Sequence, residues 1–296
     1  MHVLNLNIEA AAEYARRHLV HALVVVQNES VVFEEYSGGF TGEQPHALYS
    51  GAKSFWGVTA VAAQEDGLLH LDEPVAETIA SWRDHSPRSQ VTLRQLLQLT
   101  SGIPFGGLGK AVPTFERSLL IEVSAAPGTK FTYGGIPLQV FGAVLQRKLA
   151  GRRLSPHAYL QERILDPIGM RIARWRVLAD GSSPLPTGAF VTANEWLRFG
   201  ALILHEGRWN NAQIVRPQSL AACFHGSDAN PKYGLGFWLR PLDSPADVVY
   251  ASGSGGQALY VIPSLQTIAL HFGNGASYRH VNFLKRLFPD SICRRR

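Results

Sequence analysis

A serine and a lysine three positions apart, Ser50 and Lys53, are the first residues in this chain whose types and spacing could do chemistry. On a helix, residues three apart lie on one face with Cβ atoms about 5–6 Å apart, so this hydroxyl and amine can touch. A neighbouring amine can take the hydroxyl proton, and the positive end of a helix favours an alkoxide. Ser50 and Lys53 are therefore a candidate nucleophile and base.

The same spacing has a plainer interpretation, which is a serine at a helix N-cap followed by a solvated lysine. With 21 serines and 6 lysines in 296 residues, chance alone gives about 0.4 such pairs, so the spacing by itself favours the plainer interpretation. The next residues change the balance. Phe55 and Trp56 begin an apolar helix, in which an unpaired charged lysine would be costly.

Three sequence blocks in a fixed order resemble the penicillin-recognising serine hydrolases, the superfamily of class C β-lactamases, DD-peptidases, and related esterases and nylon-oligomer hydrolases. The blocks are residues 50–54, 63–75 and 91–103, and residues 165–170 and 192–196 add further similarity. Together they cover most of the chain. The resemblance implies a β-lactamase/transpeptidase-like fold and acylation of the serine in the first block, with no cofactor and no metal.

Tyr133 stands where this family has the tyrosine of a Tyr-x-Asn motif. The resemblance implies that Tyr133, as a phenolate or sharing a proton with Lys53, takes the proton of Ser50 and returns it to the leaving group. Taken alone, such a tyrosine would more often be an aromatic residue at a turn. Gly135 replaces the asparagine of the motif, so an amide that would orient a substrate carbonyl is missing.

The third family motif, Lys-Thr-Gly or a relaxed form of it, is best matched by Ala251, Ser252 and Gly253. The resemblance implies that Ser252 and Gly253 line the substrate site. It also implies an oxyanion hole formed by the backbone N–H groups of Ser50 and Ser254, each worth roughly a few kcal/mol in the transition state. Without the other blocks, this glycine-rich stretch would be a flexible hairpin or bulge. Its missing cation argues against efficient penicillin hydrolysis.

Other candidate sites are weaker. Trp175 could form part of the cleft wall, or it could cover a loop. His18 and His21 lack a third ligand, so no metal site is expected there. The chain has no Gly-x-Ser-x-Gly elbow, no phosphate-binding Gly-Lys-Ser/Thr loop and no His-Glu-x-x-His helix.

The composition is that of a folded globular protein, with 46% hydrophobic and 17% charged residues. The net charge of +5 owes three charges to the run Arg294, Arg295, Arg296, so nucleic acid is not an expected partner. Two cysteines, Cys223 and Cys293, fit a reducing compartment. There is no secretory signal and no apolar run of the roughly 18–20 residues that cross a bilayer. We therefore expect a cytoplasmic protein without a membrane partner.

Strand-like patterns lie at both ends of the chain, and helical patterns lie between them. Strands are predicted as a hairpin over residues 22–33 and as runs over 233–239, 258–262 and 267–272. Helices are predicted over residues 53–66, 115–123, 137–149, 156–165 and 278–288, and capping boxes at Thr92 and Thr192 begin two more.

This order predicts an α/β (α+β) fold. We expect residues 1–66 and 187–296 to form a domain with an antiparallel sheet flanked by helices, and residues 67–186 to form a mostly helical inserted domain. The cleft between the two parts is the expected place for the site.

These features predict a serine hydrolase that cleaves an ester or amide bond of a small molecule through an acyl-enzyme. Carboxylesterase activity ranks first, amidase or peptidase activity second and β-lactamase activity third, because Gly135 and Ala251 lack the polar groups that bind charged peptide-like substrates. A non-catalytic sensor or binding module that stays acylated is the alternative from another class. We expect a monomer or a small homo-oligomer.

Overall fold

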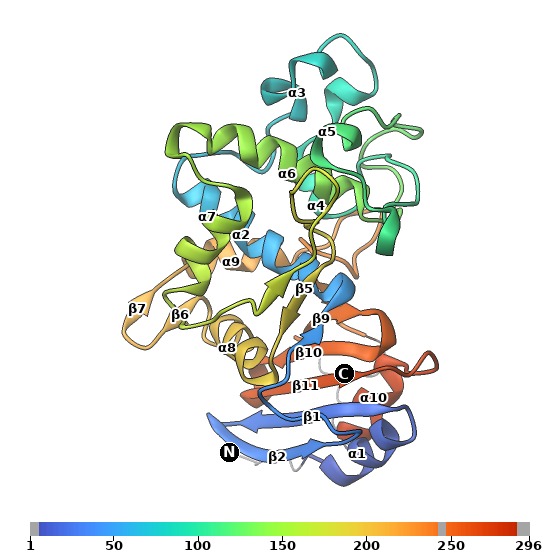
Figure 1. Cartoon of the computed structure of the whole chain (residues 1–296), viewed down its shortest axis with the longest axis vertical. Helices are drawn as coiled ribbons and strands as arrows, with labels where there is room; N and C mark the ends of the chain where they lie inside the picture. Colours follow the sequence, from blue (N-terminus) through green and yellow to red (C-terminus); the bar gives the residue numbers. More distant parts are fainter. Residues whose placement is uncertain (1–5, 242–246, 289–296) are drawn as a thin grey trace.

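The computed structural model describes residues 6–241 and 247–288. The first five residues, Cys293 and the terminal arginines 294–296, on which the expectations about the N-terminus, redox compartment and charge partly rest, lie outside these ranges. At the centre of the protein is a six-stranded sheet in the order β2-β1-β11-β10-β9-β8, seen in the lower half of Figure 1. Its strands are β1 (Val20–Gln27), β2 (Ser30–Tyr36), β8 (Trp238–Leu239), β9 (Val249–Gly253), β10 (Gln257–Ile262) and β11 (Thr267–Gly273).

The sheet joins the two ends of the chain. Strand β1 pairs antiparallel with β11, with Val24 opposite Leu270, and β11 continues through β10 into β9 by antiparallel pairing. The β-branched residues of β1 suit a strand with neighbours on both sides, because their stiff side chains pack well on a pleated surface. The predicted antiparallel sheet, with strands from both ends of the chain, is confirmed.

Helices cover both faces of this sheet. Helices α1 (Ile8–Arg16) and α10 (His280–Leu287) pack on one face, where Tyr14, Tyr260 and Phe283 belong to one buried cluster. Helix α8 (Ala193–Leu204) packs on the other face, where Trp196 and Phe199 belong to a second, larger cluster. The chain therefore has a helix–sheet–helix arrangement around two cores (Figure 1).

The regular structure of residues 67–186 is helical apart from the two-residue strand β4, and loops join the short helices; this part lies above the sheet in Figure 1. Helix α2 (Lys53–Glu65) precedes it in the chain and is buried from Lys53 to Ala63. The other helices are α3 (Val75–Thr78), α4 (Leu93–Leu97), α5 (Phe115–Ser118), α6 (Ile136–Lys148), α7 (Pro156–Leu160) and, later in the chain, α9 (Pro217–Ala221). Within residues 6–241 and 247–288, no helix combines the length and the apolar character that crossing a membrane requires.

Short strands that the sequence patterns did not predict form two small sheets. One has the order β3-β5-β4, built from β3 (His46–Ala47), β5 (Ala189–Val191) and β4 (Arg174–Trp175). The other pairs β6 (Arg208–Trp209) with β7 (Ala212–Gln213). Because β4 lies within residues 67–186 and pairs with β5 beyond them, the two predicted parts share a sheet, and their division into domains stays a prediction.

The strand predicted over residues 233–239 is wrong for most of its length, because only Trp238 and Leu239 are in a strand. The preceding residues pack against the start of α2 instead. Leu235 N–H donates to the carbonyl of Cys223 at 3.0 Å, and the Ser54 hydroxyl donates to the carbonyl of Gly236 at 2.7 Å. Tertiary contacts with a buried helix thus override a local strand pattern.

The two predicted capping boxes have different outcomes. At α4, Thr92 accepts from the Gln95 N–H and the Gln95 side chain accepts from the Thr92 N–H, so the box is complete. At α8, Thr192 accepts from the Glu195 N–H, whereas the Glu195 carboxylate accepts from the Arg171 N–H at 2.6 Å. The second box is therefore half formed, because its acidic residue bonds a neighbouring segment.

Candidate active site

Ser50 lies in a 3₁₀ turn, Tyr49–Ala52, that leads directly into α2. Neither this turn nor α2 has a side-chain cap at its N-terminus. The half-buried Ser50 hydroxyl oxygen accepts a hydrogen bond from Lys53 Nζ at 2.7 Å. The interpretation of Ser50 as an N-cap serine is therefore wrong, and the hydroxyl and amine lie in direct contact.

Lys53 is fully enclosed, with 0% of its surface exposed. Its Nζ lies 3.5 Å from the Tyr133 hydroxyl and 4.7 Å from the centroid of the Tyr133 ring. Burial disfavours the charged ammonium and lowers the pKa of Lys53 from 10.5 to about 7. A large fraction of the protein molecules therefore holds a neutral amine beside Ser50 near neutral pH.

Tyr133 lies in the loop that precedes α6, facing Lys53 across the site. Burial raises the pKa of its phenol above the ordinary value, and a hydrogen bond with Ser50 opposes this shift only in part. Its ring packs against Tyr233 at 6.0 Å and stacks on Trp238 at 5.7 Å between centroids. Tyr133 is therefore a protonated phenol at neutral pH, held in place by aromatic neighbours.

Gly135 precedes the first residue of α6, and the segment around Gly106 and Gly107 lies directly on it. The Gly135 N–H donates to the Gly106 carbonyl at 2.9 Å. A Cβ atom added at Gly135 would lie 1.9 Å from the Gly107 carbonyl oxygen, a distance that real atoms do not reach. The space for an asparagine side chain is therefore filled by backbone. Phe105, 73% exposed, stands on the same segment.

The predicted third motif lies at the end of β9. A Cβ atom added at Gly253 would lie 2.0 Å from the carbonyl oxygen of Leu48, so glycine allows this strand to approach the turn that carries Ser50. The next residue, Ser254, begins a second 3₁₀ turn, Ser254–Gly256. The N–H groups of Ser50 and Ser254 each lie in the first turn of a 3₁₀ segment, where the turn itself supplies no acceptor. The structure thus places the two predicted donors on adjoining segments.

Two residues that the sequence analysis did not single out hold this region together. Gln257 is fully buried and donates to the carbonyls of Ser254 at 2.8 Å and Gly273 at 2.7 Å. His280, the first residue of α10, lies 2.8 Å from the Ser252 hydroxyl through its Nε2. No local pattern marks either residue, because each partner comes from another element of the fold.

Trp175 lies on β4, and its ring packs against His157 at 4.5 Å and Trp56 at 6.1 Å between centroids. These contacts connect it to α2 and α7, and its predicted place on the cleft wall stays a prediction. His18 contacts the Tyr14 carbonyl, whereas His21 pairs with His46 at 2.9 Å. Over residues 6–241 and 247–288, no three His, Cys, Asp or Glu side chains gather as metal ligands would.

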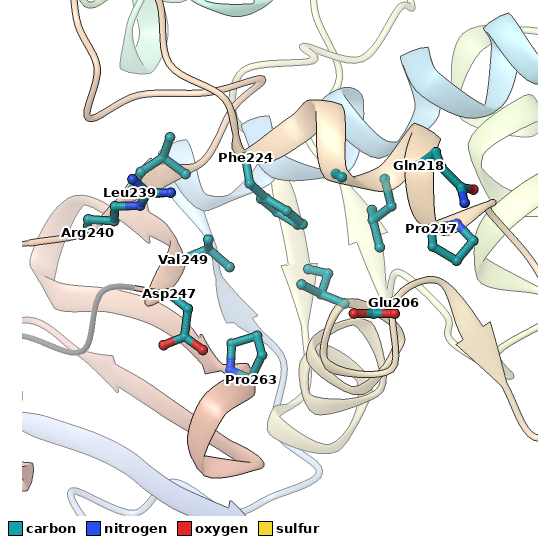
Figure 2. Close-up of a pocket in the computed structure, with 12 residues that line it drawn as sticks. Glu206, Pro217, Gln218, Phe224, Leu239, Arg240, Asp247, Val249 and Pro263 are labelled. Carbon is teal, nitrogen blue, oxygen red and sulfur yellow. The ribbon is translucent and has the colours of Figure 1, made fainter.

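A separate cavity of about 440 Å³ lies between α8, α9 and the ends of β8 and β9. Figure 2 shows Phe224 and Val249 at its apolar interior and Glu206 and Asp247 nearer its edges. Ser50, Lys53 and Tyr133 are not among its lining residues. The polar cluster described above is therefore a different place in the molecule.

Taken together, the cluster has a half-buried hydroxyl beside an amine that is substantially neutral near pH 7, a protonated phenol within reach, and two backbone donors on adjoining segments. These are the groups required to activate a serine and to stabilise an oxyanion in acyl transfer.

Solved structures of similar fold come from several kinds of protein. A proposed beta-lactamase from Bacteroides dorei DSM 17855 is 23% identical, with 91% of this chain and 90% of that chain covered and a TM-score of 0.75. A proposed 6-aminohexanoate-dimer hydrolase from Bacillus anthracis is 20% identical, with 91% and 77% covered and a TM-score of 0.76. EstCE1, a hydrolase with promiscuous acyltransferase activity, is 15% identical, with 97% and 98% covered and a TM-score of 0.76. At these identities the similarity shows the fold.

No curated protein sequence matches this chain. The sequence model of the Beta-lactamase family matches residues 7–284, which is nearly the whole chain and includes every candidate residue above. The expected β-lactamase/transpeptidase-like fold is confirmed. This chain belongs to the Beta-lactamase family.

Proposed function

We propose that this protein is a serine hydrolase that cleaves uncharged carboxylic esters through an acyl-enzyme at Ser50. The observation that carries the proposal is the 2.7 Å contact between the Ser50 hydroxyl and the fully buried Lys53 amine. A lysine whose pKa lies near 7 can act as a base at neutral pH, and it touches the atom whose proton must leave.

Acylation begins when the neutral Lys53 amine takes the Ser50 proton and Ser50 Oγ attacks the ester carbonyl carbon. The carbonyl π electrons move to the oxygen, giving a tetrahedral oxyanion. When the ester C–O bond breaks, the leaving alkoxide receives a proton from Tyr133, which recovers one from the Lys53 ammonium 3.5 Å away. Attack by water, with its proton taken by the same pair, releases the acid and restores Ser50.

The oxyanion is stabilised by the backbone N–H groups of Ser50 and Ser254. Preorganised donors of this kind are worth roughly 3–4 kcal/mol each. The close packing of Gly253 on Leu48 supports this role, because it holds the two turns at a fixed separation.

The preference for uncharged esters follows from two missing polar groups. At Gly135 no side chain can be accommodated beneath the Gly107 carbonyl, so the site around Ser50 lacks an amide that could bind a peptide-like carbonyl. At position 251 the chain has a buried alanine in place of a cation, which removes an anchor for a substrate carboxylate. Amide or peptide hydrolysis therefore ranks second, and β-lactam hydrolysis third.

Steady-state rates with p-nitrophenyl esters of increasing chain length, measured beside nitrocefin, test the proposal. We expect multiple turnovers of the esters, slow or absent nitrocefin hydrolysis, and loss of ester turnover in Ser50→Ala with an unchanged melting temperature. Rapid nitrocefin hydrolysis with inert esters would reverse the ranking, and an active Ser50→Ala variant would place the nucleophile elsewhere.

A non-catalytic module that is acylated once is the second candidate, and the absence of polar side chains at positions 135 and 251 favours it. The same ester assay separates the two candidates. A sensor releases one equivalent of p-nitrophenol and then stops, whereas a hydrolase continues at a steady rate.

A further inference from the structure

A chain of hydrogen bonds runs from the buried face of the sheet to the end of β9. The Tyr278 and Tyr260 hydroxyls lie 3.0 Å apart, the Tyr260 hydroxyl lies 2.6 Å from His280 Nδ1, and His280 Nε2 lies 2.8 Å from the Ser252 hydroxyl. The four residues come from β9, β10, α10 and the segment before α10. Ser252, whose hydroxyl ends this series of hydrogen bonds, is two residues before Ser254, a proposed oxyanion donor.

Ser252 is partly exposed near the end of β9, the strand that packs against the turn carrying Ser50. Strand β8 pairs with β9 only at Val249 and Tyr250, so within the described part of the chain the outer edge of β9 is open from residue 251 onward. Ser252 is half-buried, and the adjacent Gly253 lies against Leu48 in the segment that carries Ser50. An acyl-enzyme at Ser50 would thus lie beside this open edge.

The direction of the hydrogen bonds follows from the chemistry of the partners. Burial and, to a smaller extent, the positive charge of the neighbouring Arg279 lower the pKa of His280 from 6.5 to about 4, so the imidazole is neutral at pH 7. An imidazole nitrogen is a better acceptor than a phenol oxygen, and the Tyr260 contact with His280 is shorter than that with Tyr278. Tyr260 therefore donates to Nδ1, which leaves the imidazole proton on Nε2.

With its proton on Nε2, His280 donates to the Ser252 oxygen, and the Ser252 hydroxyl proton remains available for another partner. The His280 ring is fixed in turn by Tyr260 and by the ring of Tyr250, 4.9 Å away between centroids. The arrangement thus orients an uncharged donor at the open edge of β9.

We infer that His280 is a positioning residue for the hydrolysis proposed above: it fixes the Ser252 hydroxyl so that this hydroxyl donates to an uncharged acceptor atom of the bound ester beside the oxyanion site. The inference rests on the proposed function. It gives the site around Ser50 a neutral polar anchor close to Ala251, which stands where the family has a cation, in keeping with a preference for uncharged substrates.

A set of His280 variants separates positioning of Ser252 from a role in holding α10. In His280→Gln the amide nitrogen is as many bonds from Cα as Nε2 and can still donate to Ser252. In His280→Asn the amide matches Nδ1 and keeps the Tyr260 contact but does not reach Ser252. His280→Ala, Ser252→Ala and the Ser252→Ala/His280→Ala double variant complete the set, and His225→Asn, at an exposed histidine, is the control.

The readouts are kcat and KM for p-nitrophenyl butyrate, the melting temperature, and mass spectrometry after treatment with a fluorophosphonate. If a hydrogen bond is equally strong in the substrate complex and in the transition state, its loss raises KM about tenfold and leaves kcat unchanged. We expect this change in Ser252→Ala, His280→Asn and His280→Ala, values close to wild type in His280→Gln and the control, and no further loss in the double variant.

The inference is overturned if His280→Asn behaves as wild type while His280→Gln is impaired, if all His280 variants keep the wild-type KM, or if the two alanine substitutions add in the double variant. Should His280→Ala fail to fold, Ser252→Ala and His280→Gln still decide the question. A wild-type protein that turns over no ester and is not labelled at Ser50 would instead overturn the proposed function, and the inference with it.

Discussion

The carbonyl oxygen of Gly107 lies where any side chain at Gly135 would begin, only 1.9 Å from the position of a Cβ atom. The absence of a side chain at Gly135 is therefore imposed by the backbone packed against it. Gly135 has not simply lost an amide, because the neighbouring backbone has taken up the space that the amide would need. A second contact, from the Gly135 N–H to the Gly106 carbonyl at 2.9 Å, holds that backbone in place.

Restoring the family asparagine should therefore fail. In Gly135→Asn the Gly107 carbonyl must move, and since it is backbone rather than a flexible side chain, we expect a loss of stability of about 1–3 kcal/mol or more and no gain in nitrocefin hydrolysis. Urea unfolding and nitrocefin assays measure both. Gly151→Asn is the matched control, because a Cβ atom there meets nothing within 4 Å. A stable Gly135→Asn variant with new β-lactamase activity would contradict this explanation.

Replacing the buried amine should stabilise the protein and abolish its activity. Lys53 has a pKa of about 7 in the folded state against 10.5 for the free side chain, so below pH 7 its burial costs on the order of 5 kcal/mol. Lys53→Met keeps the length of the side chain without the charge. We expect ester turnover to fall by at least about a thousandfold, and the melting temperature at pH 6 to rise by several degrees.

The pH dependence of that stabilisation identifies its cause. Between pH 7 and 10.5 the unfolded wild type binds more protons than the folded protein, so wild-type stability increases with pH through this window. The advantage of Lys53→Met should therefore be largest below pH 7 and shrink as the pH rises toward 10. Lys130→Met, at an exposed lysine, serves as the control. A Lys53→Met variant less stable than wild type at pH 6 would show that burial of the amine is not the dominant effect.

The parts of this fold that the sequence predicted are those fixed by local patterns. The hairpin of β1 and β2, helix α2 and the capping box at Thr92 each depend on residues within a few positions of one another. The contact between Ser50 and Lys53 belongs to the same class, because one helical turn brings the two side chains together.

The parts that the sequence did not predict depend on partners far along the chain. Residues 233–236 have a strand-like pattern, yet their backbone bonds to Ser54 and Cys223 decide their conformation. His280 and Ser252 are 28 residues apart, and nothing near either one indicates the other. The lack of space for a side chain at Gly135 could be predicted only from the position of the Gly107 carbonyl in the folded protein. Such contacts follow from tertiary packing and have no local signature.

The rate of ester hydrolysis should rise with pH through about 7, because the reactive form of Lys53 is the free amine. We expect kcat/KM for p-nitrophenyl butyrate to show one such ionisation between pH 5 and 9. Burial keeps Tyr133 protonated throughout this range, so Tyr133→Phe should lower the rate but leave the midpoint within about 0.5 of the wild-type value. If the midpoint disappears in Tyr133→Phe, the ionisation belongs to the tyrosine and the assignment of Lys53 as the base is wrong.

Gln257 provides a test of the oxyanion site that does not touch the nucleophile. Its amide nitrogen donates to the carbonyls of Ser254 and Gly273, while its amide oxygen accepts from the Gly273 N–H at 3.1 Å. In Gln257→Glu the amide nitrogen, which donates two hydrogen bonds, is replaced by an oxygen that donates none when ionised and one when protonated. At least one of the two carbonyls therefore loses its partner, and the turn that carries Ser254 must shift. We expect kcat to fall about 10–100-fold with a smaller change in KM, because an oxyanion donor acts in the transition state.

The matched control for this substitution is Gln266→Glu, at an exposed turn that follows the same strand. Gln266 donates to the Pro263 carbonyl, so its replacement makes the same chemical change far from the oxyanion site and should leave kcat unaltered. The reaction of Ser50 with a fluorophosphonate also places negative charge on an oxygen, in this case one bound to phosphorus. The rate of this labelling should therefore fall in parallel with kcat in Gln257→Glu. Equal losses in the two variants, or a Gln257→Glu effect confined to KM, would mean that Gln257 supports the sheet in general rather than the position of the Ser254 N–H.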